Sequence, residues 1–411
     1  MITVSHPTGN ANVRAALRGL EAAGLLGQFH TAIATYPGNV YDGLSKLGPL
    51  RDFARRTFPS ELATKTYTHP WKELGRLLAG KVGLQTLTRH ETGALSVDAV
   101  YHSIDRRAAG SLARVRPTAV YAYEDGAAQT FTRARNLGIP TLYDLPIGYW
   151  RAARRIMGEV VDQRPDWAMT VNSLQDSPAK LARKDRELAL ADHIFVASSF
   201  TAATLSEYPG TLPPVEVIPY GFPPAVSDRQ YVAGGSRPLR LLFVGGLSQR
   251  KGLAEMFEAI DRFGSRVALT VVGRLPAADC PALSRALGQH TYIPSLPHAE
   301  ILQLMRQQDL LLFPSHFEGF GLVITEAMSQ GTPVITTERT AGPDLITDGE
   351  DGYLVPAGSA DALATRIEAL LAEPVRIEQV GRAASHRAGQ RPWSVYGLEL
   401  AAAVTRVLAN D

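Results

Sequence analysis

The sequence has very little cysteine and no long apolar run. Cys280 is the only cysteine among the 411 residues, so no disulfide can form within the chain and nothing indicates an oxidising compartment. No uninterrupted apolar run of about 18 residues could span a bilayer, and the opening MITVSHPTGN lacks the basic and apolar segments of a secretory signal. These absences predict a cytoplasmic protein and leave peripheral contact with the inner face of a membrane open.

An excess of one charge is also missing. Lysine and arginine number 42 against 40 acidic residues, a net charge of +2, which gives no reason to expect a nucleic-acid partner. Residues 1–225 carry a net charge of +5 and residues 226–411 a net charge of −3. This asymmetry indicates two halves with different partners.

Two nucleotide motifs are absent. The chain has neither the G-x-x-x-x-G-K-[ST] phosphate loop nor the G-x-G-x-x-G dinucleotide fingerprint, so ATP hydrolysis and nicotinamide chemistry lose support. An Asp-x-Asp pair is absent as well.

Short aliphatic runs, each followed by a turn and a helical stretch, are what the chain does contain. They include AVYAY, HIFVASS, LRLLFVGG and DLLLFPS, and this alternation is typical of an α/β fold with buried parallel strands. The Pro- and Gly-rich stretch 219–238 has no periodicity and is typical of a linker between domains. We expect two doubly wound, Rossmann-like domains, 1–225 and 226–390, facing each other across a cleft, and a C-terminal helix, 391–411, crossing back to the first.

The stretch SHFEGFGLVITEAMSQG, 315–331, places two glutamates around a glycine turn after a predicted strand. Glu318 would lie in the loop at the carboxyl end of that strand, where open α/β sheets bind ligands. Gly319 and Gly321 would let a ligand approach the backbone, and the amides opening the next helix favour an anion such as phosphate. Glu326, in that helix, could accept hydrogen bonds from a ribose. Acids near a helix start also simply stabilise the helix dipole.

A second cluster is LLFVGGLSQRKGL, 241–253, where Arg250 and Lys251 follow a strand and a glycine pair. Two cations beside a flexible turn could neutralise a diphosphate. Taken alone, such a pair is more often solvated.

The stretches VIPYGF, FVGGLSQRKGL, DLLLFPSHFEGFGLVITEAMSQGTPVITT and AGPDLITDGEDGYLVPAG together resemble the retaining glycosyltransferases of family 4, which have the GT-B fold. The resemblance is dense over about residues 218–375. It implies a nucleotide-diphosphate-sugar donor bound mainly to the C-terminal domain, a hydroxyl acceptor of glycan, lipid-linked or small-molecule type, and no obligatory metal or other cofactor.

Site residues follow from the resemblance by position. It implies that Glu326 binds the ribose, that Arg250 and Lys251 bind the diphosphate, and that Glu318 contacts the transferred sugar. The backbone of Gly319, Phe320, Gly321 and Leu322 would contact phosphate and sugar.

Two positions depart from the family pattern. Family members usually have an arginine where this chain has Gly246, so Arg250 is the candidate for the second cation. A histidine is often found at the cleft end of a central N-terminal strand, where this chain offers Glu124 and Asp125. The group that assists the acceptor proton is therefore open between these two acids.

The N-terminal half adds candidates for the cleft. A first strand leads into a loop with His6 and Gly9 that would face the cleft, where Gly9 is a candidate for donor binding and His6 for acceptor binding. His6 could carry a proton, although most single histidines are structural. In LYDLPIGYW, Asp144 and Tyr149 are candidates for acceptor binding. The alternative, that the aromatic residues of this stretch pack in the core, is at least as well supported.

KLGPLRDFARRTF, 46–58, sets apolar residues on one helical face and basic residues on others, as interfacial helices do. An ordinary surface helix packed on the sheet has the same pattern and is favoured.

Two other functions stay open. A nucleotide-sugar epimerase of the same fold would act on the donor alone. A nucleotide-sugar-binding scaffold with weakened chemistry is the reading that Gly246 and the missing histidine favour.

Overall fold

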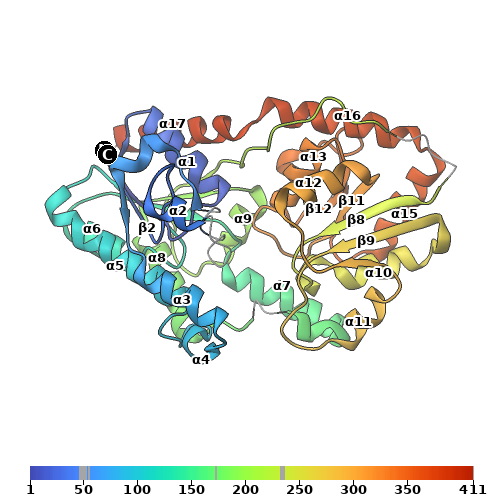
Figure 1. Cartoon of the computed structure of the whole chain (residues 1–411), viewed down its shortest axis with the longest axis horizontal. Helices are drawn as coiled ribbons and strands as arrows, with labels where there is room; N and C mark the ends of the chain where they lie inside the picture. Colours follow the sequence, from blue (N-terminus) through green and yellow to red (C-terminus); the bar gives the residue numbers. More distant parts are fainter. Residues whose placement is uncertain (46–52, 54–55, 172–173, 232–236, 411) are drawn as a thin grey trace.

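The computed structural model consists of two α/β lobes lying side by side, as the sequence predicted (Figure 1). It describes residues 1–45, 53, 56–171, 174–231 and 237–410. Each lobe is built on one sheet whose strand pairs are all parallel.

The N-terminal sheet has seven strands in the order β3-β2-β1-β4-β5-β6-β7. Its central strands are buried throughout, which is why their sequences are continuously apolar rather than alternating. The strands are β1 (Ile2–Ser5), β2 (Leu26–Thr31), β3 (Thr66–Thr68), β4 (Val120–Tyr123), β5 (Thr141–Leu145), β6 (His193–Val196) and β7 (Val215–Val217).

The C-terminal sheet has six strands in the order β10-β9-β8-β11-β12-β13. Its centre is again fully buried, with Leu310, Leu311, Leu312 and Phe313 of β11 all in the core. The strands are β8 (Leu239–Val244), β9 (Val267–Val272), β10 (Thr291–Ile293), β11 (Leu310–Phe313), β12 (Val334–Thr337) and β13 (Tyr353–Val355).

Helices connect the strands and cover the sheets. Ser96 and Ser177 cap α5 and α8 through hydrogen bonds from backbone amides to their hydroxyl oxygens, and Pro178 opens α8 at a position whose amide needs no partner. In the N-terminal lobe the helices are α1 (Ala11–Ala22), α2 (Val40–Ser45), α3 (Trp71–Lys81), α4 (Gln85–Thr88), α5 (Val97–Val115), α6 (Ala128–Asn136), α7 (Trp150–Gln163), α8 (Pro178–Leu190) and α9 (Ser199–Thr204). In the rest of the chain they are α10 (Leu253–Asp261), α11 (Pro281–Leu287), α12 (His298–Gln307), α13 (Leu322–Ser329), α14 (Gly342–Leu345), α15 (Ala360–Ala372), α16 (Val375–Gln390) and α17 (Trp393–Asn410).

Both sheets reverse their winding at one place. In the N-terminal sheet the chain moves outward from β1 to β3 and then returns to β4 on the other side of β1, and the C-terminal sheet repeats this at β8 and β11. Open α/β sheets bind ligands outside the carboxyl ends of the strands at such a switch point. The loops after β1, β4, β8 and β11 are therefore the places to examine.

The last helix returns to the first lobe. Figure 1 shows α17 continuing from α16 across to α1. The two helices approach so closely that a Cβ atom on Gly19 would lie 1.9 Å from the carbonyl oxygen of Gly397. Where the chain crosses, Phe222 donates its amide to the carbonyl of Arg391 at 2.9 Å. The second crossing is thus hydrogen-bonded to the first.

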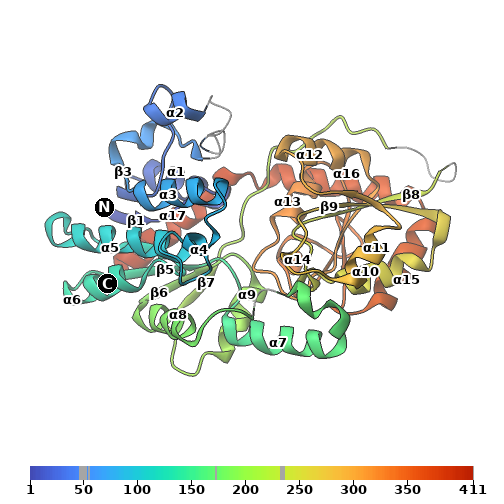
Figure 2. The same ribbon diagram turned by 60° about the horizontal axis from the view of Figure 1, so that its bottom comes forward.

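The lobes also touch beside the cleft, where Figure 2 shows α7 and α9 next to the C-terminal lobe. The hydroxyls of Ser198 and Thr201 donate to the carbonyl oxygen of Gly319 at 2.5 and 3.0 Å. Arg164, just after α7, bonds the carboxylates of Glu255 at 3.1 Å and Glu258 at 2.6 Å. The two lobes are therefore linked through polar side chains as well as through the backbone.

Most of the amphipathic segment proposed at 46–58 lies outside the described residues, including Lys46, Leu47, Leu50, Arg51, Ala54 and Arg55. Of its described members, Phe53 is 1% exposed, Arg56 is buried in an ion pair with Glu73, and Thr57 is exposed. Among the helices of the described part of the chain, none combines the length and apolarity needed to cross a membrane.

Candidate active site

The loop after β8 holds two cations in a short 3-10 turn, Gln249–Lys251. The hydroxyl of Ser248 accepts a hydrogen bond from the Arg250 amide at 3.3 Å, and Gly252 ends the turn with φ = +71°. A Cβ atom at this glycine would lie 2.0 Å from the carbonyl oxygen of Pro314, so only glycine fits. The turn is thereby fixed against the end of β11.

Arg250 and Lys251 share one carboxylate. Arg250 Nη1 lies 3.0 Å from Glu318 Oε2 and also donates to the carbonyl oxygen of Phe317 at 2.7 Å, while Lys251 Nζ is ion-paired with the same Glu318 oxygen. The Lys251 ammonium also lies 4.6 Å from the ring centroid of Phe313. The structure therefore brings together three of the residues that the sequence proposed.

These cations are partly removed from water. Burial lowers the pKa of Arg250, and burial together with the nearby Arg250 guanidinium lowers the pKa of Lys251. A single carboxylate faces two positive groups. Because the cluster has an excess of positive charge, a second anion placed beside it would be stabilised.

Helix α13 begins beside this cluster. Its N-cap, Gly321, has φ = +88°, and no side chain caps the helix start. The first amides of a helix lack partners within it, so this start offers donors to an anion. Leu322, the first helical residue, is partly buried.

Glu326 lies within the same helix and has a partner that the sequence did not suggest. Its Oε1 lies 2.9 Å from Nε2 of His298, the first residue of α12. The bond to Glu326 raises the pKa of His298. The two residues lie 28 positions apart in different helices, so no local sequence pattern joins them.

Gly319 lies against the other lobe. A Cβ atom there would lie 2.2 Å from the carbonyl oxygen of Pro146 in the N-terminal lobe, and the approach of a ligand to its backbone stays a prediction. The missing side chain admits the other lobe's backbone. Phe320 is 3% exposed, and its ring packs against Tyr220 with a centroid distance of 4.8 Å, so its side chain belongs to the core.

Gly246 is exposed, and a Cβ atom there would meet nothing within 4 Å. There is thus space for a side chain at Gly246, the position where the family resemblance implies an arginine. Arg250 lies three residues beyond the buried Leu247, with its guanidinium on Glu318.

The residues after β1 are enclosed. His6 is 6% exposed, its Nδ1 lies 2.5 Å from the carbonyl oxygen of Thr8, and burial lowers its pKa to about 4. Gly9 is buried under the ring of Phe58, which a Cβ atom would approach to 2.5 Å. Neither residue joins the cation cluster.

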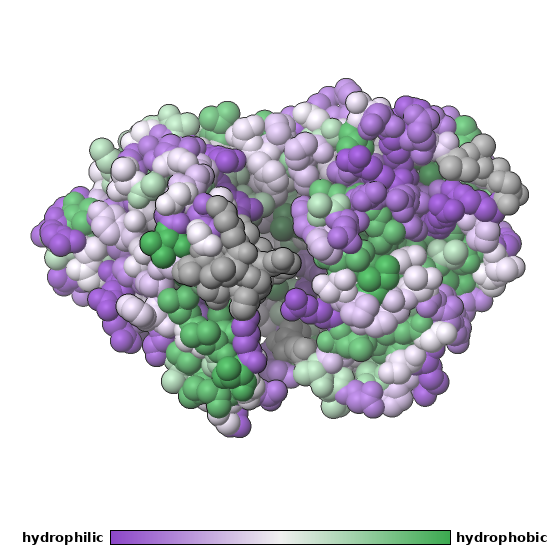
Figure 3. Space-filling model, viewed as in Figure 1, coloured by the Kyte–Doolittle hydropathy of each residue, from purple (hydrophilic) through white to green (hydrophobic). Residues whose placement is uncertain are grey.

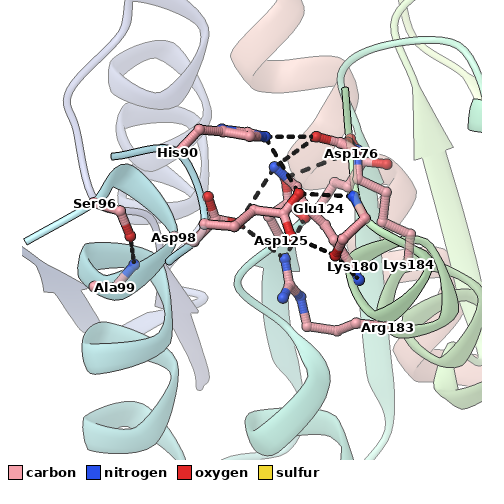
Figure 4. A network of polar contacts seen from close by, with 12 residues as sticks. His90, Ser96, Asp98, Ala99, Glu124, Asp125, Asp176, Lys180, Arg183 and Lys184 are labelled. Atoms are coloured by element: carbon pink, nitrogen blue, oxygen red, sulfur yellow. Dashed lines mark hydrogen bonds and ion pairs between the residues drawn. The ribbon is translucent and has the colours of Figure 1, made fainter. Parts of the chain in front are cut away.

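The two acids after β4 belong to a network of charges at the carboxyl end of the N-terminal sheet (Figure 4). Lys184 Nζ lies 3.3 Å from Glu124, and Arg183 Nη2 lies 3.0 Å from Asp125. Burial is the main cause that raises the pKa of Glu124 to about 7. We name the whole set the α8 network; its members are Asp98, Glu124, Asp125, Asp176, Lys180, Arg183 and Lys184.

Asp144 and Tyr149 are occupied inside the N-terminal lobe. Asp144 is 3% exposed and accepts a hydrogen bond from the Tyr121 hydroxyl at 2.6 Å, and burial raises its pKa to about 7. Tyr149 is 1% exposed and donates its hydroxyl to Asp185 at 2.7 Å. The structure brings neither to the cation cluster.

A buried polar group behind the cluster was also missed. Nε2 of His316 lies 3.0 Å from Glu255, which also accepts from the Gln249 amide at 2.8 Å. Glu255 is the residue that Arg164 reaches from the other lobe. These residues come from three separate segments, so no single local sequence pattern could reveal them together.

Within the described part of the chain, one group has the spacing of metal ligands. His90, Glu91 and Asp176 each offer one atom, and these atoms lie within 4.8 Å of one another. The ammonium of Lys180 lies 3.2 Å from Asp176 and competes with a metal cation for this carboxylate.

Comparison with solved structures defines the fold class. The chain is similar to sucrose-phosphate synthase from Thermosynechococcus elongatus, with a TM-score of 0.65 and 19% identity over 100% of this chain and 99% of that one. It is also similar to Anabaena HepE, solved in complex with UDP-glucose, with a TM-score of 0.62 and 16% identity over 98% and 99% of the two chains. At these identities the likeness establishes the fold, which is GT-B.

Comparison with protein families gives a match to the C-terminal lobe, and comparison with curated proteins gives matches over part of the chain. Residues 227–387 match the model of the family described as Glycosyl transferases group 1, the region whose motifs carry the resemblance. A D-inositol 3-phosphate glycosyltransferase of Segniliparus rotundus is 30% identical over 234 residues, 52% of each chain. A phosphatidyl-myo-inositol mannosyltransferase of Mycobacterium leprae is 31% identical over 166 residues, 39% of this chain and 44% of that one. The chain spans about half the length of these curated relatives.

Proposed function

We propose that the protein transfers a glycosyl group, with retention of configuration, from a nucleotide-diphosphate sugar to a hydroxyl acceptor. The observation that carries the proposal is the pair of cations, Arg250 and Lys251, sharing Glu318 beside the start of α13. The match of residues 227–387 to the Glycosyl transferases group 1 family supports the same reaction.

The donor would lie across the carboxyl ends of β8 and β11. Arg250, Lys251 and the amides that open α13 hold the diphosphate and stabilise the charge that builds on it as the sugar departs. Glu326 accepts hydrogen bonds from the ribose hydroxyls. With the diphosphate bound, Lys251 is drawn toward the phosphate and Glu318 is freed to accept a hydrogen bond from the sugar.

Transfer breaks the bond between the anomeric carbon and the diphosphate oxygen and forms a bond from that carbon to the acceptor oxygen. Retention follows if the acceptor attacks on the face from which the diphosphate leaves. The acceptor proton then passes to a phosphate oxygen of the leaving group. This assignment needs no obligatory metal, because cationic side chains and helix amides supply the positive charge.

The acceptor would bind at the N-terminal lobe. The α8 network sets three cations against four carboxylates, so it has acidic groups to spare for hydrogen bonds with hydroxyls. Glu124 and Asp125, directly after β4 at the switch point, are the candidates for contact with the reacting hydroxyl.

A panel of UDP-, GDP- and ADP-sugars tests the donor, because a ligand that binds only the native state raises its melting temperature. UDP-glucose comes first, since the Anabaena protein of similar fold was solved with it. We expect a shift with one base only and, with a matching acceptor, a product whose anomeric configuration by NMR is that of the donor. A shift with no member of the panel contradicts the proposal.

A nucleotide-sugar-binding protein with weak chemistry is the second candidate. The open position at Gly246, which adds no cation, favours it. A melting-temperature shift without turnover over a broad acceptor panel would support it. Isomerised sugar formed from the donor alone would instead indicate an epimerase.

A further inference from the structure

The α3–α4 hairpin carries apolar side chains on its outer side. Figure 3 shows apolar residues gathered at the lower left of the molecule, over α3 and α4, at the edge of the hollow between the lobes. Of the fifteen large apolar side chains that are exposed in the described part of the chain, five lie between residues 71 and 87. They are Trp71 (81% exposed), Leu78 (57%), Val82 (68%), Leu84 (49%) and Leu87 (37%).

Core packing does not explain these residues. The inner side of α3 is already formed by other residues, with Ala79 buried and Leu74 and Leu77 packed on the cluster around Phe53. A Cβ atom on Gly75 would lie 2.9 Å from Leu95, so the helix is seated tightly on the chain beneath it. The helix therefore presents a second apolar side to its surroundings, and contiguous exposed apolar surface marks an interaction site.

The charged side chains that follow Leu74 in this hairpin all have one sign. Between Leu74 and His90 the sequence contains no aspartate or glutamate, and it contains Arg76, Lys81 and Arg89. Lys81 and Arg89 are exposed. The carboxylates that flank this stretch are both bound by other groups: Glu73 is 3% exposed and ion-paired with Arg56 and Arg76, and Glu91 lies 3.3 Å from His90 and accepts a hydrogen bond from the Ser177 amide. Apolar side chains next to exposed, unbalanced cations are complementary to a surface that is apolar inside and anionic outside.

We propose that the α3–α4 hairpin docks the protein on an anionic phospholipid bilayer. Trp71 and the leucines would enter the boundary between headgroups and acyl chains, where tryptophan is favoured, and Lys81 and Arg89 would face the phosphates. A second copy of the chain fits less well, because pairing this surface with itself brings the exposed Lys81 and Arg89 of the two copies together.

The docking surface borders the mouth of the cleft in Figure 3, so a docked protein would hold its cleft close to the lipid. The inference goes beyond the proposed function. It concerns residues that lie outside the donor and acceptor sites.

Vesicle flotation tests the proposal with the full-length protein. We expect flotation with vesicles of equal parts phosphatidylcholine and phosphatidylglycerol at low salt, and none with phosphatidylcholine alone. The triple variant Trp71→Ser, Leu78→Ser, Leu84→Ser should lower the affinity at least about tenfold, and Lys81→Ala with Arg89→Ala about tenfold at low salt. Trp71 is the exposed member of the four tryptophans, so its fluorescence should shift to the blue on binding, and Trp71→Phe should lose the shift.

The control is the double variant Val375→Ser, Leu398→Ser, which removes apolar side chains of 61% and 59% exposure elsewhere on the protein. It should float like the wild type. Failure of the wild type to float at low salt overturns the proposal, as does equal loss in the control. A concentration-dependent dimer that the triple variant abolishes, without vesicle binding, would show that the surface pairs with a second copy and also overturns it.

The donor melting-temperature shift, measured on every variant, keeps this inference apart from the proposed function. A triple variant that no longer floats but keeps the shift supports docking as a separate property. Flotation of a protein that no nucleotide sugar stabilises would uphold docking and contradict the transferase.

Discussion

The two lobes share one winding order but carry opposite charge balances at their switch points. After β8 and β11, two cations face one carboxylate, and the amides that open α13 lie beside them. In the α8 network, near the end of β4, four carboxylates face three cations, and each carboxylate forms an ion pair with at least one of these cations. The same backbone arrangement thus carries an excess of positive charge in one lobe and of negative charge in the other, and the side chains at the strand ends decide which.

The largest effect should come from removing a cation at the C-terminal switch point. Lys251→Ala removes the ammonium proposed to neutralise the leaving diphosphate, and we expect kcat/KM to fall by about 10²–10³-fold. The donor melting-temperature shift should disappear as well. Lys180→Ala, in the α8 network, is the matched control and should keep that shift; loss of the shift in both variants would erase the contrast between the lobes.

A smaller effect is expected where the lobes meet. Gly319→Ala adds a methyl group that would lie 2.2 Å from the Pro146 carbonyl, so the lobes must separate. Forcing extra volume into a packed contact costs about 1–3 kcal/mol. We expect a lower melting temperature and a larger radius of gyration by X-ray scattering; an unchanged radius would show that the lobes adjust without opening.

Glu326→Gln should raise the donor KM about tenfold, because a hydrogen bond to a charged group is stronger than one to an amide. The same change should return the pKa of His298 from its raised value toward that of a free histidine, as followed by NMR. A fall in the pKa of His298 with an unchanged KM would separate the Glu326–His298 pair from donor binding.

A last effect, confined to the pH dependence of stability, concerns Asp144, whose folded pKa of about 7 lies above the ordinary 3.8. Between these values the folded protein keeps a proton that the unfolded chain has released, so this group lowers stability as the pH rises from about 4 to 7 and adds no further change above. Asp144→Asn lacks this dependence. Its melting temperature should therefore gain on the wild type across that pH range, whereas parallel curves would mean that Asp144 is not a buried acid.

The fold could be predicted where strands are buried on both faces. All of the central strands appeared as apolar runs in the sequence, because parallel strands between two layers of helices have no solvent side. Three edge strands were not predicted: β3, β10 and β13 have only three residues each, TYT, TYI and YLV. Two of them also lie partly exposed at the rim of the sheet, so neither length nor hydrophobicity marks them.

The site could be predicted where one loop holds all of its parts. Arg250 and Lys251, and Glu318 to Gly321, are each contiguous, and their strands are neighbours. What lay beyond the sequence were contacts between distant segments. The sequence of α8 does not show that Lys184 forms an ion pair with Glu124. The residues around Gly319 do not show that the carbonyl of Pro146 packs against this glycine.

The paired crossings at Phe222 and Arg391 limit how the molecule can be divided and how it can move. An N-terminal fragment ending in the linker would lose α17 and leave bare the side of α1 that this helix covers, so a soluble half-molecule must carry both ends of the chain. In the whole protein, the two crossing segments are hydrogen-bonded to each other. They allow the lobes to rotate about one axis but hinder rotation of one lobe relative to the other about the line that joins them. Substrate entry and product release would then take place through a hinge motion of the two lobes about the paired crossings.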